Sequence, residues 1–161
     1  ISEYISEIKR ENFSVTEQIH KILTEAKRLN KEYNFFNTIS EDLALQQAKE
    51  IEKKIKNKDT KGKLLGLPIS IKDCICVKNL ESSAGSKIIK DYKPLFNATC
   101  IQKALDEGAI IIGKTSQDEF GFGSFSINTF NIPKIHLTNQ EVVAVLQVVQ
   151  QDLRKKQPCL I

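Results

Sequence analysis

The stretch Gly66-Leu67-Pro68-Ile69-Ser70-Ile71-Lys72-Asp73 decides what fold this chain can adopt. Glycine and proline punctuate its start and β-branched residues fill its end, which predicts a short strand. The strand ends on a charged pair, Lys72 and Asp73. A charged amine at the end of a buried strand is costly unless it is paired or neutral. Lys72 is therefore the residue that most needs a chemical explanation.

The position of Lys72 leaves two interpretations open. In the first, Lys72 forms a structural pair with Asp73 at a sheet edge, because most lysines in proteins are exposed and structural. In the second, burial favours the neutral amine, which can then act as a base near neutral pH. The sequence by itself does not decide between them.

The residues downstream predict a helix and a second strand. Asn97-Ala98-Thr99 starts a helix that Gly108 ends. The run from Ala109 to Ile112 then predicts a fully buried strand, closed by Gly113. Residues 108–115 also match the spacing of a phosphate-binding loop, but the apolar run between the two glycines favours a strand instead. Strand, helix and strand in this order predict an α/β fold.

The residues upstream predict two amphipathic helices. Ser14-Val15-Thr16-Glu17 reads as a capping box, and Thr38-Ile39-Ser40-Glu41 as a second helix start. The expected fold class is thus α/β, a mixed β-sheet with flanking helices that follows two amphipathic helices. We expect an N-terminal helical segment at 1–57, a sheet-containing part at 58–134 and a separate tail at 135–161.

Composition places the chain among ordinary globular proteins. Its 161 residues are 40% hydrophobic and 27% charged, with a net charge of +4. The longest apolar run, Val142 to Leu146, is far too short to span a membrane. The four cysteines lack the spacing of a zinc site and are expected to be reduced thiols, so no metal is expected. The expected location is cytoplasmic, or an organelle if a transit segment has been lost from the N-terminus.

Three separated motifs resemble the amidase-signature family. Residues 66–73 look like its Gly-x-Pro-x-x-x-Lys-Asp segment, and residues 113–124 are similar to its Gly-Lys-Thr-Asn-x-Asp-Glu-Phe-x-x-Gly-Ser segment. Residues 83–88 and 94–99 occupy the places expected between them. The likeness covers Leu64 to Pro133, which implies that the chain holds the N-terminal part of the amidase-signature fold.

Within the family, the chain resembles the A subunit of glutamyl-tRNA(Gln)/aspartyl-tRNA(Asn) amidotransferases, which is their glutaminase subunit. This resemblance implies an enzyme that hydrolyses glutamine and supplies ammonia to a mischarged tRNA. In the family's Ser–cis-Ser–Lys triad, the lysine that matches Lys72 takes a proton from the bridging serine. The loop residues Gly121, Phe122, Gly123 and Ser124 are candidates for the substrate pocket.

The resemblance also implies partners and cofactors. It implies an amidotransferase B subunit with a small C subunit, and no membrane partner. ATP and Mg²⁺ are implied for the B subunit, whereas no cofactor is implied for this chain. Two alternatives stay open: a stand-alone amidase of the same family, and a truncated, non-catalytic binding module. Asp118 and Glu119 are expected to be structural and to shape the following loop through local hydrogen bonds.

The sequence departs from the family after Lys134. The family continues to Gly-Gly-Ser-Ser-Gly-Gly, with the bridging serine, and then to the nucleophilic serine. Residues 135–161 contain no serine and no glycine. A one-base shift of the reading frame after Lys134 permits codons for a Cys-Gly-Gly-Ser-Ser-Gly-Gly-Ala segment. The hypothesis is that the tail is a frameshift product and that this chain is inactive.

Overall fold

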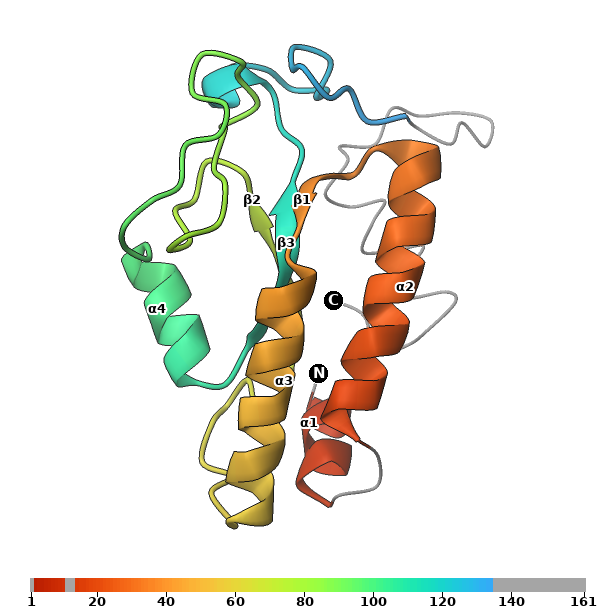
Figure 1. Ribbon diagram of the computed structural model, residues 1–161, viewed down its shortest axis with the longest axis vertical. Helices are drawn as coiled ribbons and strands as arrows, with labels where there is room; N and C mark the ends of the chain where they lie inside the picture. Colours follow the sequence, from red (N-terminus) through yellow and green to blue (C-terminus); the bar gives the residue numbers. More distant parts are fainter. Residues whose placement is uncertain (1, 11–13, 135–161) are drawn as a thin grey trace.

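A three-stranded mixed sheet lies between two layers of helices (Figure 1). The computed structural model describes residues 2–10 and 14–134, and the predicted frameshifted tail at 135–161 lies outside these residues. The strands are β1 (Phe36–Ile39), β2 (Pro68–Lys72) and β3 (Ile110–Thr115), in the order β1-β3-β2. β1 runs antiparallel to β3, and β2 runs parallel to it. The predicted mixed sheet is confirmed.

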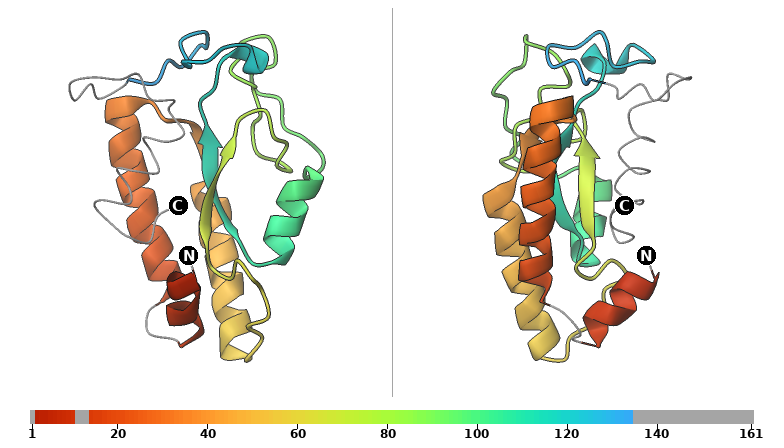
Figure 2. Two further views of the ribbon diagram at one scale, coloured as in Figure 1. Left: turned by 180° about the vertical axis from the view of Figure 1, so that it is seen from behind. Right: turned by 90° about the vertical axis from the view of Figure 1, so that its right-hand side faces the viewer.

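Helices cover both faces of this sheet. Figure 2 shows α2 (Val15–Tyr33) and α3 (Glu41–Lys56) on one side of the strands and α4 (Thr99–Asp106) on the other. The short α1 (Ser2–Lys9) lies near the start of α2, and a single turn of 3-10 helix, η1 (Glu119–Gly121), follows β3. Within the described residues, no helix is both long and apolar enough to cross a membrane.

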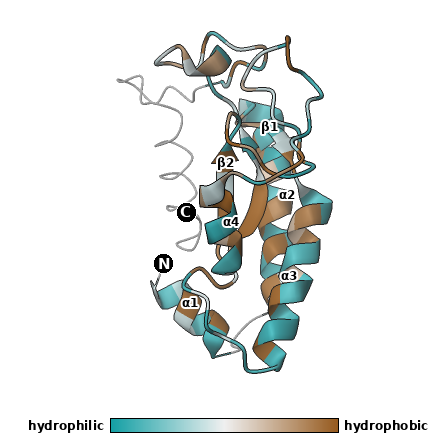
Figure 3. Ribbon diagram, turned by 90° about the vertical axis from the view of Figure 1, so that its left-hand side faces the viewer, coloured by the Kyte–Doolittle hydropathy of each residue, from teal (hydrophilic) through white to brown (hydrophobic). Residues whose placement is uncertain are grey.

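The alternation of side chains along β3 divides the core in two. Ile110 and Ile112 join the larger cluster, which packs α1, α2 and α3 against the sheet. Ile111 points to the opposite face and joins a smaller cluster with Ile101 of α4. Every residue of β3 is buried, as expected for a central strand covered on both faces. Figure 3 shows the corresponding pattern on α2 and α3, where apolar and polar stretches alternate along the ribbon.

Local signals account for the ends of α2. Ser14 caps it by accepting a hydrogen bond from the Glu17 amide at 3.2 Å, which is the hydroxyl half of the predicted capping box, while the Glu17 carboxylate pairs with Lys21 instead. Glu52 of α3 adds a second cap, because its carboxylate accepts the Thr16 amide at 2.9 Å and the Ser14 hydroxyl at 2.5 Å. Asn34 ends the helix in the left-handed conformation, with φ of 56°.

Two predicted boundaries are wrong. Thr38 does not start a helix: it lies in β1, and Ser40 is the N-cap of α3. The Ser40 hydroxyl donates to the Ile111 carbonyl at 2.8 Å instead of capping the helix, which ties the start of α3 to the central strand. Gly113 does not close β3, because the strand continues through Lys114 to Thr115.

Candidate functional site

The candidate site lies where β2 and β3 end. The two strands are parallel, and Lys72 stands opposite Thr115 in their register. Open α/β sheets bind their ligands outside the carboxyl ends of such strands. Lys72 is half-buried, and its amine forms no hydrogen bond or ion pair with any described residue. The amine at this strand end is therefore free to meet another group.

Asp73, the next residue, is almost fully buried and heavily hydrogen-bonded. Its carboxylate accepts from the Ser83 hydroxyl at 2.5 Å, the Asn37 amide at 2.8 Å and the Gly85 backbone N–H at 3.2 Å. Its side chain is 1% exposed. Through these hydrogen bonds, Asp73, in the turn after β2, connects that turn to β1 and to the loop at 82–86.

The charged partner of Asp73 is Lys114 and not its neighbour in sequence. Lys114 Nζ lies 3.6 Å from an oxygen of the Asp73 carboxylate, 3.0 Å from the Asp73 carbonyl and 2.6 Å from the Ser82 hydroxyl. Both side chains of the ion pair are buried, at 0% and 1% exposure. The structural alternative, a Lys72–Asp73 pair, is therefore corrected: Asp73 is paired with Lys114, and Lys72 has no partner within residues 2–10 and 14–134.

Burial changes the titration of Lys114. Loss of hydration lowers the pKa of its amine below the ordinary value of 10.5, and the nearby Asp73 carboxylate offsets part of this shift. Lys114 is the buried lysine that the strand pattern led us to look for at Lys72. The available signal was the apolar run from Ala109 to Ile112 that leads into it, which is typical of a strand buried on both faces.

Gln117 is a second buried polar residue near this strand end that the sequence did not reveal. Its side-chain oxygen accepts the Cys74 backbone N–H at 3.2 Å, which fixes the orientation of the amide. Its Nε2 is buried and has no acceptor among the described residues. Gly85 allows this close packing, because a Cβ there would lie 2.5 Å from the Gln117 carbonyl and the backbone φ is +70°.

The candidate pocket loop is organised by Asp118. The carboxylate accepts the backbone N–H groups of Ser126 at 2.9 Å and Asn128 at 3.0 Å. A Cβ at Gly123 would lie 2.3 Å from the carboxyl carbon of Asp118, so only glycine lets the loop fold around it. The Glu119 carboxylate accepts the Ser86 hydroxyl at 2.6 Å. The prediction of local hydrogen bonds to the following loop is confirmed for Asp118, whereas Glu119 has a structural contact with a distant residue instead.

The predicted site residues follow the ends of two neighbouring strands, β2 and β3. Gly121, Phe122, Gly123 and Ser124 are all exposed, and Phe122 is 81% exposed. No described hydrogen bond or ion pair joins them to Lys72. The link is indirect: Phe120 N–H donates to the Ala84 carbonyl at 2.8 Å, and the neighbouring Gly85 holds Asp73. The loop and Lys72 are thus fixed to the same buried network.

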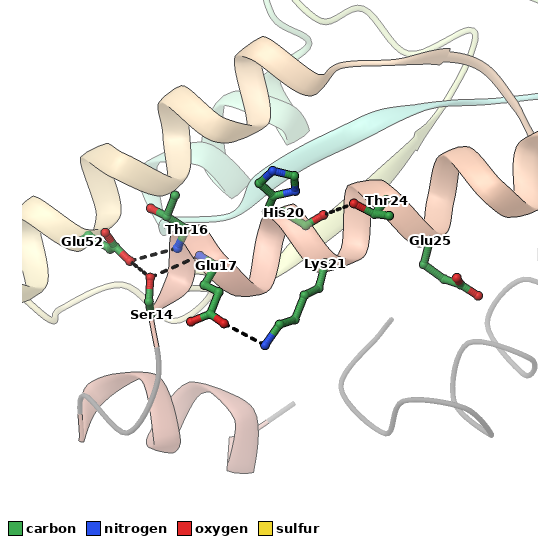
Figure 4. Close-up of a pocket in the computed structure, with 8 residues that line it drawn as sticks. All are labelled: Ser14, Thr16, Glu17, His20, Lys21, Thr24, Glu25 and Glu52. Carbon is green, nitrogen blue, oxygen red and sulfur yellow. Dashed lines mark hydrogen bonds and ion pairs between the residues drawn. The ribbon is translucent and has the colours of Figure 1, made fainter.

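A separate groove lies along α2 and is not part of this site. Figure 4 shows its lining residues, among them His20, Glu17 and Glu52. The Glu17 carboxylate is paired with Lys21 at 3.0 Å, and Glu52 caps α2. These two carboxylates therefore interact with residues of α2 itself. Within residues 2–10 and 14–134, no cluster of three or more His, Cys, Asp or Glu side chains could hold a metal ion.

Comparison with known proteins agrees with this geometry. The family model described as Amidase matches residues 17–140. The chain is 46% identical over 109 residues to a glutamyl-tRNA(Gln) amidotransferase A-type subunit of Clostridium acetobutylicum, covering 67% of this chain and 23% of that protein. It is 40% identical over 126 residues to the mitochondrial glutamyl-tRNA(Gln) amidotransferase A-type subunit of Homo sapiens, covering 78% and 24%.

Solved structures show the same fold. The peptide amidase of Stenotrophomonas maltophilia superposes with a TM-score of 0.70 at 23% identity, over 74% of this chain and 25% of that one. The chain belongs to the amidase family, whose model matches most of its length. The relatives of known sequence to which it is similar are A-type subunits of glutamyl-tRNA(Gln) amidotransferases, and it spans about a quarter of their length.

Proposed function

We propose that this chain is the N-terminal part of the glutaminase subunit of a tRNA-dependent amidotransferase, with Lys72 as its catalytic base. The observation that carries the proposal is the unpaired amine of Lys72 at the carboxyl end of β2, fixed beside the buried Asp73–Lys114 pair. A general base needs a free lone pair within reach of the proton it removes. An amine already held by a carboxylate would be a poor candidate.

In the proposed reaction, the Lys72 amine takes a proton from a bridging serine, which takes one from the nucleophilic serine. That serine attacks the carboxamide of glutamine, and ammonia leaves as the C–N bond breaks, carrying the proton that Lys72 returns through the bridging serine. Water then hydrolyses the glutamyl–serine ester, which releases glutamate and restores the serine. Both serines would come from the part of the domain beyond the described residues. Gly121, Phe122, Gly123 and Ser124 would line the glutamine pocket. A B subunit would activate the tRNA-bound acid with ATP and Mg²⁺, and a small C subunit would join them.

We further propose that residues 135–161 are read out of frame and that one correction restores the family sequence. The support is the loss of glycine and serine after Lys134, where the family needs a glycine-rich loop and a bridging hydroxyl. Valine is strongly disfavoured at the positive φ values that such loops use. Sequencing the gene and its transcript through the Lys134 codon tests this. Stop codons in the shifted frame before the glycine–serine segment would refute it.

The test of function uses the frame-corrected full-length chain, purified with its B and C subunits. Ammonia release from glutamine is measured for the wild type, for Lys72→Ala and for Lys78→Ala, an exposed lysine in the loop after β2. A catalytic base contributes about 10²–10⁴-fold, so Lys72→Ala should lose that much while Lys78→Ala keeps its rate. Equal rates for all three would reject Lys72 as the base. Hydrolysis of other amides, with glutamine inert, would favour a stand-alone amidase.

A further inference from the structure

The positive charge of this chain is concentrated in one short stretch, residues 53–63, which we call the basic segment. It contains six lysines and one acidic residue, Asp59, so its net charge of +5 exceeds the +4 of the whole chain. The remaining residues are together slightly acidic. The basic segment comprises the last turn of α3 and the loop that leads toward β2. Positive charge gathered in this way is typical of a surface that binds a polyanion.

No lysine of the basic segment is held by a carboxylate of the described residues. All six are exposed, and none of their amines forms a hydrogen bond or an ion pair with a described residue. The carboxylates beside the segment are engaged with backbone groups. Glu52 accepts the Thr16 N–H at 2.9 Å, and Glu107 accepts the backbone N–H of Lys63 at 2.7 Å. The six amines are therefore available to an outside partner.

The end of α3 accounts for only half of these lysines. Lys53, Lys54 and Lys56 lie in the last turn, where positive charge is favourable because the carboxyl end of a helix carries partial negative charge. The other three follow the helix, within residues 58–63, and have no such role. Lysines one helical turn apart also repel each other. The needs of the fold therefore do not explain the basic segment as a whole.

Backbone hydrogen bonds hold the basic segment in a defined shape. The Asp59 N–H donates to the Lys54 carbonyl at 2.9 Å, which keeps the start of the loop against the end of α3. The Leu64 N–H donates to the Glu107 carbonyl at 3.0 Å, so the far end of the segment is fixed beside α4. Gly62 permits this contact, because a Cβ there would lie 2.2 Å from the same carbonyl oxygen. The backbone that carries the lysines thus needs little ordering before it binds.

The composition of the basic segment favours a phosphate backbone over a membrane or a protein as its partner. Among the described residues, every large apolar side chain with high exposure lies within residues 88–132, so the basic segment offers none to a bilayer or to a protein pocket. Membrane-surface helices and protein interfaces both depend on such side chains, and lysine is depleted from protein interfaces. Lysine contacts to phosphates need only charge, and they dominate the affinity for nucleic acids.

We propose that the basic segment binds the phosphate backbone of a tRNA. The identity of the nucleic acid rests on the proposed function, because phosphate contacts carry no sequence information. Figure 1 shows the yellow end of α3 at the opposite end of the fold from η1 and from the ends of β2 and β3. The RNA is therefore held away from Lys72. The lysines of the segment set its affinity and take no part in glutamine hydrolysis.

The test measures the affinity of the 161-residue chain for a fluorescently labelled tRNA(Gln) transcript by anisotropy. The titration is repeated at several salt concentrations, between about 50 and 200 mM KCl. The variant combines Lys54→Gln, Lys56→Gln and Lys58→Gln and should bind about tenfold more weakly or worse. Each phosphate contact contributes about 0.7–0.9 to the slope of log K against log salt concentration, so this slope should become shallower by about 2–3.

The matched control removes the same amount of charge from another exposed loop. It combines Lys87→Gln, Lys90→Gln and Lys93→Gln and should bind like the wild type. Circular dichroism checks that both triple variants keep the helical signal of the wild type. Weakening by the variant of the basic segment alone supports the proposal. A wild type that does not bind tRNA overturns it, and so does equal weakening by both triple variants, since net charge alone would then govern binding.

A membrane partner and a failure of the proposed function have separate signatures. Binding to vesicles of phosphatidylcholine and phosphatidylserine, with no binding to tRNA, overturns the proposal in favour of an anionic membrane. The binding assay contains no glutamine, so its result does not depend on glutaminase activity. If tRNA binding depends on the basic segment while the frame-corrected enzyme releases no ammonia, the RNA surface stands and the glutaminase proposal loses support. The converse result rejects the RNA surface alone.

Discussion

At the scale of single residues, the chemistry of this chain depends on which of two lysines is paired. Lys114 is fully buried and holds Asp73, whereas Lys72 is half-buried and has no partner among the described residues. A buried ion pair fixes the positions of the groups around it, but its net contribution to the free energy of unfolding is often small. Its contribution here is to fix the turn that follows Lys72, because three further donors converge on the same Asp73 carboxylate.

Removing Asp73 should therefore be costly. Asp73→Ala leaves the Lys114 ammonium buried without a counter-charge, and we expect a loss of about 3–5 kcal/mol in the free energy of unfolding, measured by urea denaturation. Lys114→Met should cost less, because Asp73 keeps its hydrogen bonds from Asn37, Ser83 and Gly85. Asp59→Ala, an exposed carboxylate, is the control and should stay within about 0.5 kcal/mol of the wild type. A larger loss for Lys114→Met than for Asp73→Ala would contradict this account.

Stability should also respond to pH through Lys114. Burial lowers the pKa of its amine in the folded chain, below the ordinary value of 10.5 that the unfolded chain retains. Between these two values the unfolded state binds more protons, so the free energy of unfolding rises with pH. Below the folded-state pKa, the penalty for burying the charge is present in full.

The measurement compares the wild type with Lys114→Met, which lacks the titrating amine. The free energy of unfolding of both is determined from neutral pH upward to about pH 10.5, where the amine of the unfolded chain titrates. We expect the wild type to gain stability relative to the variant as the pH rises. A relative loss would mean that Asp73 outweighs burial and raises the pKa of Lys114.

At the scale of elements, β1 depends on a glycine of its partner strand. A Cβ at Gly113 would lie 2.3 Å from the Thr38 carbonyl oxygen, which is backbone and cannot rotate away. Gly113→Ala should therefore push β1 from β3. Gly121→Ala is the matched control: its φ is +81°, so alanine costs about 1–2 kcal/mol in conformation, but nothing lies within 4 Å.

Hydrogen exchange distinguishes these two glycine variants. The Ser40 amide donates to the Ile112 carbonyl at 2.8 Å, next to the β1–β3 contact. We expect its exchange to become at least tenfold faster in Gly113→Ala, which corresponds to about 1.4 kcal/mol of local stability. Gly121→Ala should leave it unchanged. Equal exchange in both variants would show that β1 tolerates the added methyl group.

At the scale of the whole molecule, the described residues contain the proposed base, Lys72, but not the glycine–serine segment of the proposed mechanism. Ser83 is committed to Asp73 and Ser86 to Glu119, and both hydroxyls are buried. We expect the purified chain of 161 residues to release ammonia from glutamine at the buffer background. Lys72→Ala should give the same background. Activity above it that disappears in Lys72→Ala would contradict the prediction, because it would require a nucleophile within this chain.

Sequence reasoning was most successful where the signal is local. The cap at Ser14, the strand that ends at Lys72, the helix that Gly108 ends and the role of Asp118 each depend on residues a few positions apart. Neighbouring residues determine helix caps, turns and short strands of this kind. The motifs at 66–73 and 113–124 also identified the family, since they occur in order at family spacing.

Tertiary structure alone decided the pairings between distant residues. β1 exists because β3, a strand far along the chain, supplies its hydrogen bonds, so the four-residue stretch Phe36–Ile39 carries little signal of its own. The partner of Asp73 is Lys114, 41 positions along the chain, and not the adjacent Lys72. The physical reason is that a buried charge is stabilised by whatever the fold brings within reach, and adjacency in sequence does not determine that. The sequence predicted the strand that ends at Lys72 and the buried run that leads toward Lys114, and the packing of the two strands decided which amine is left free.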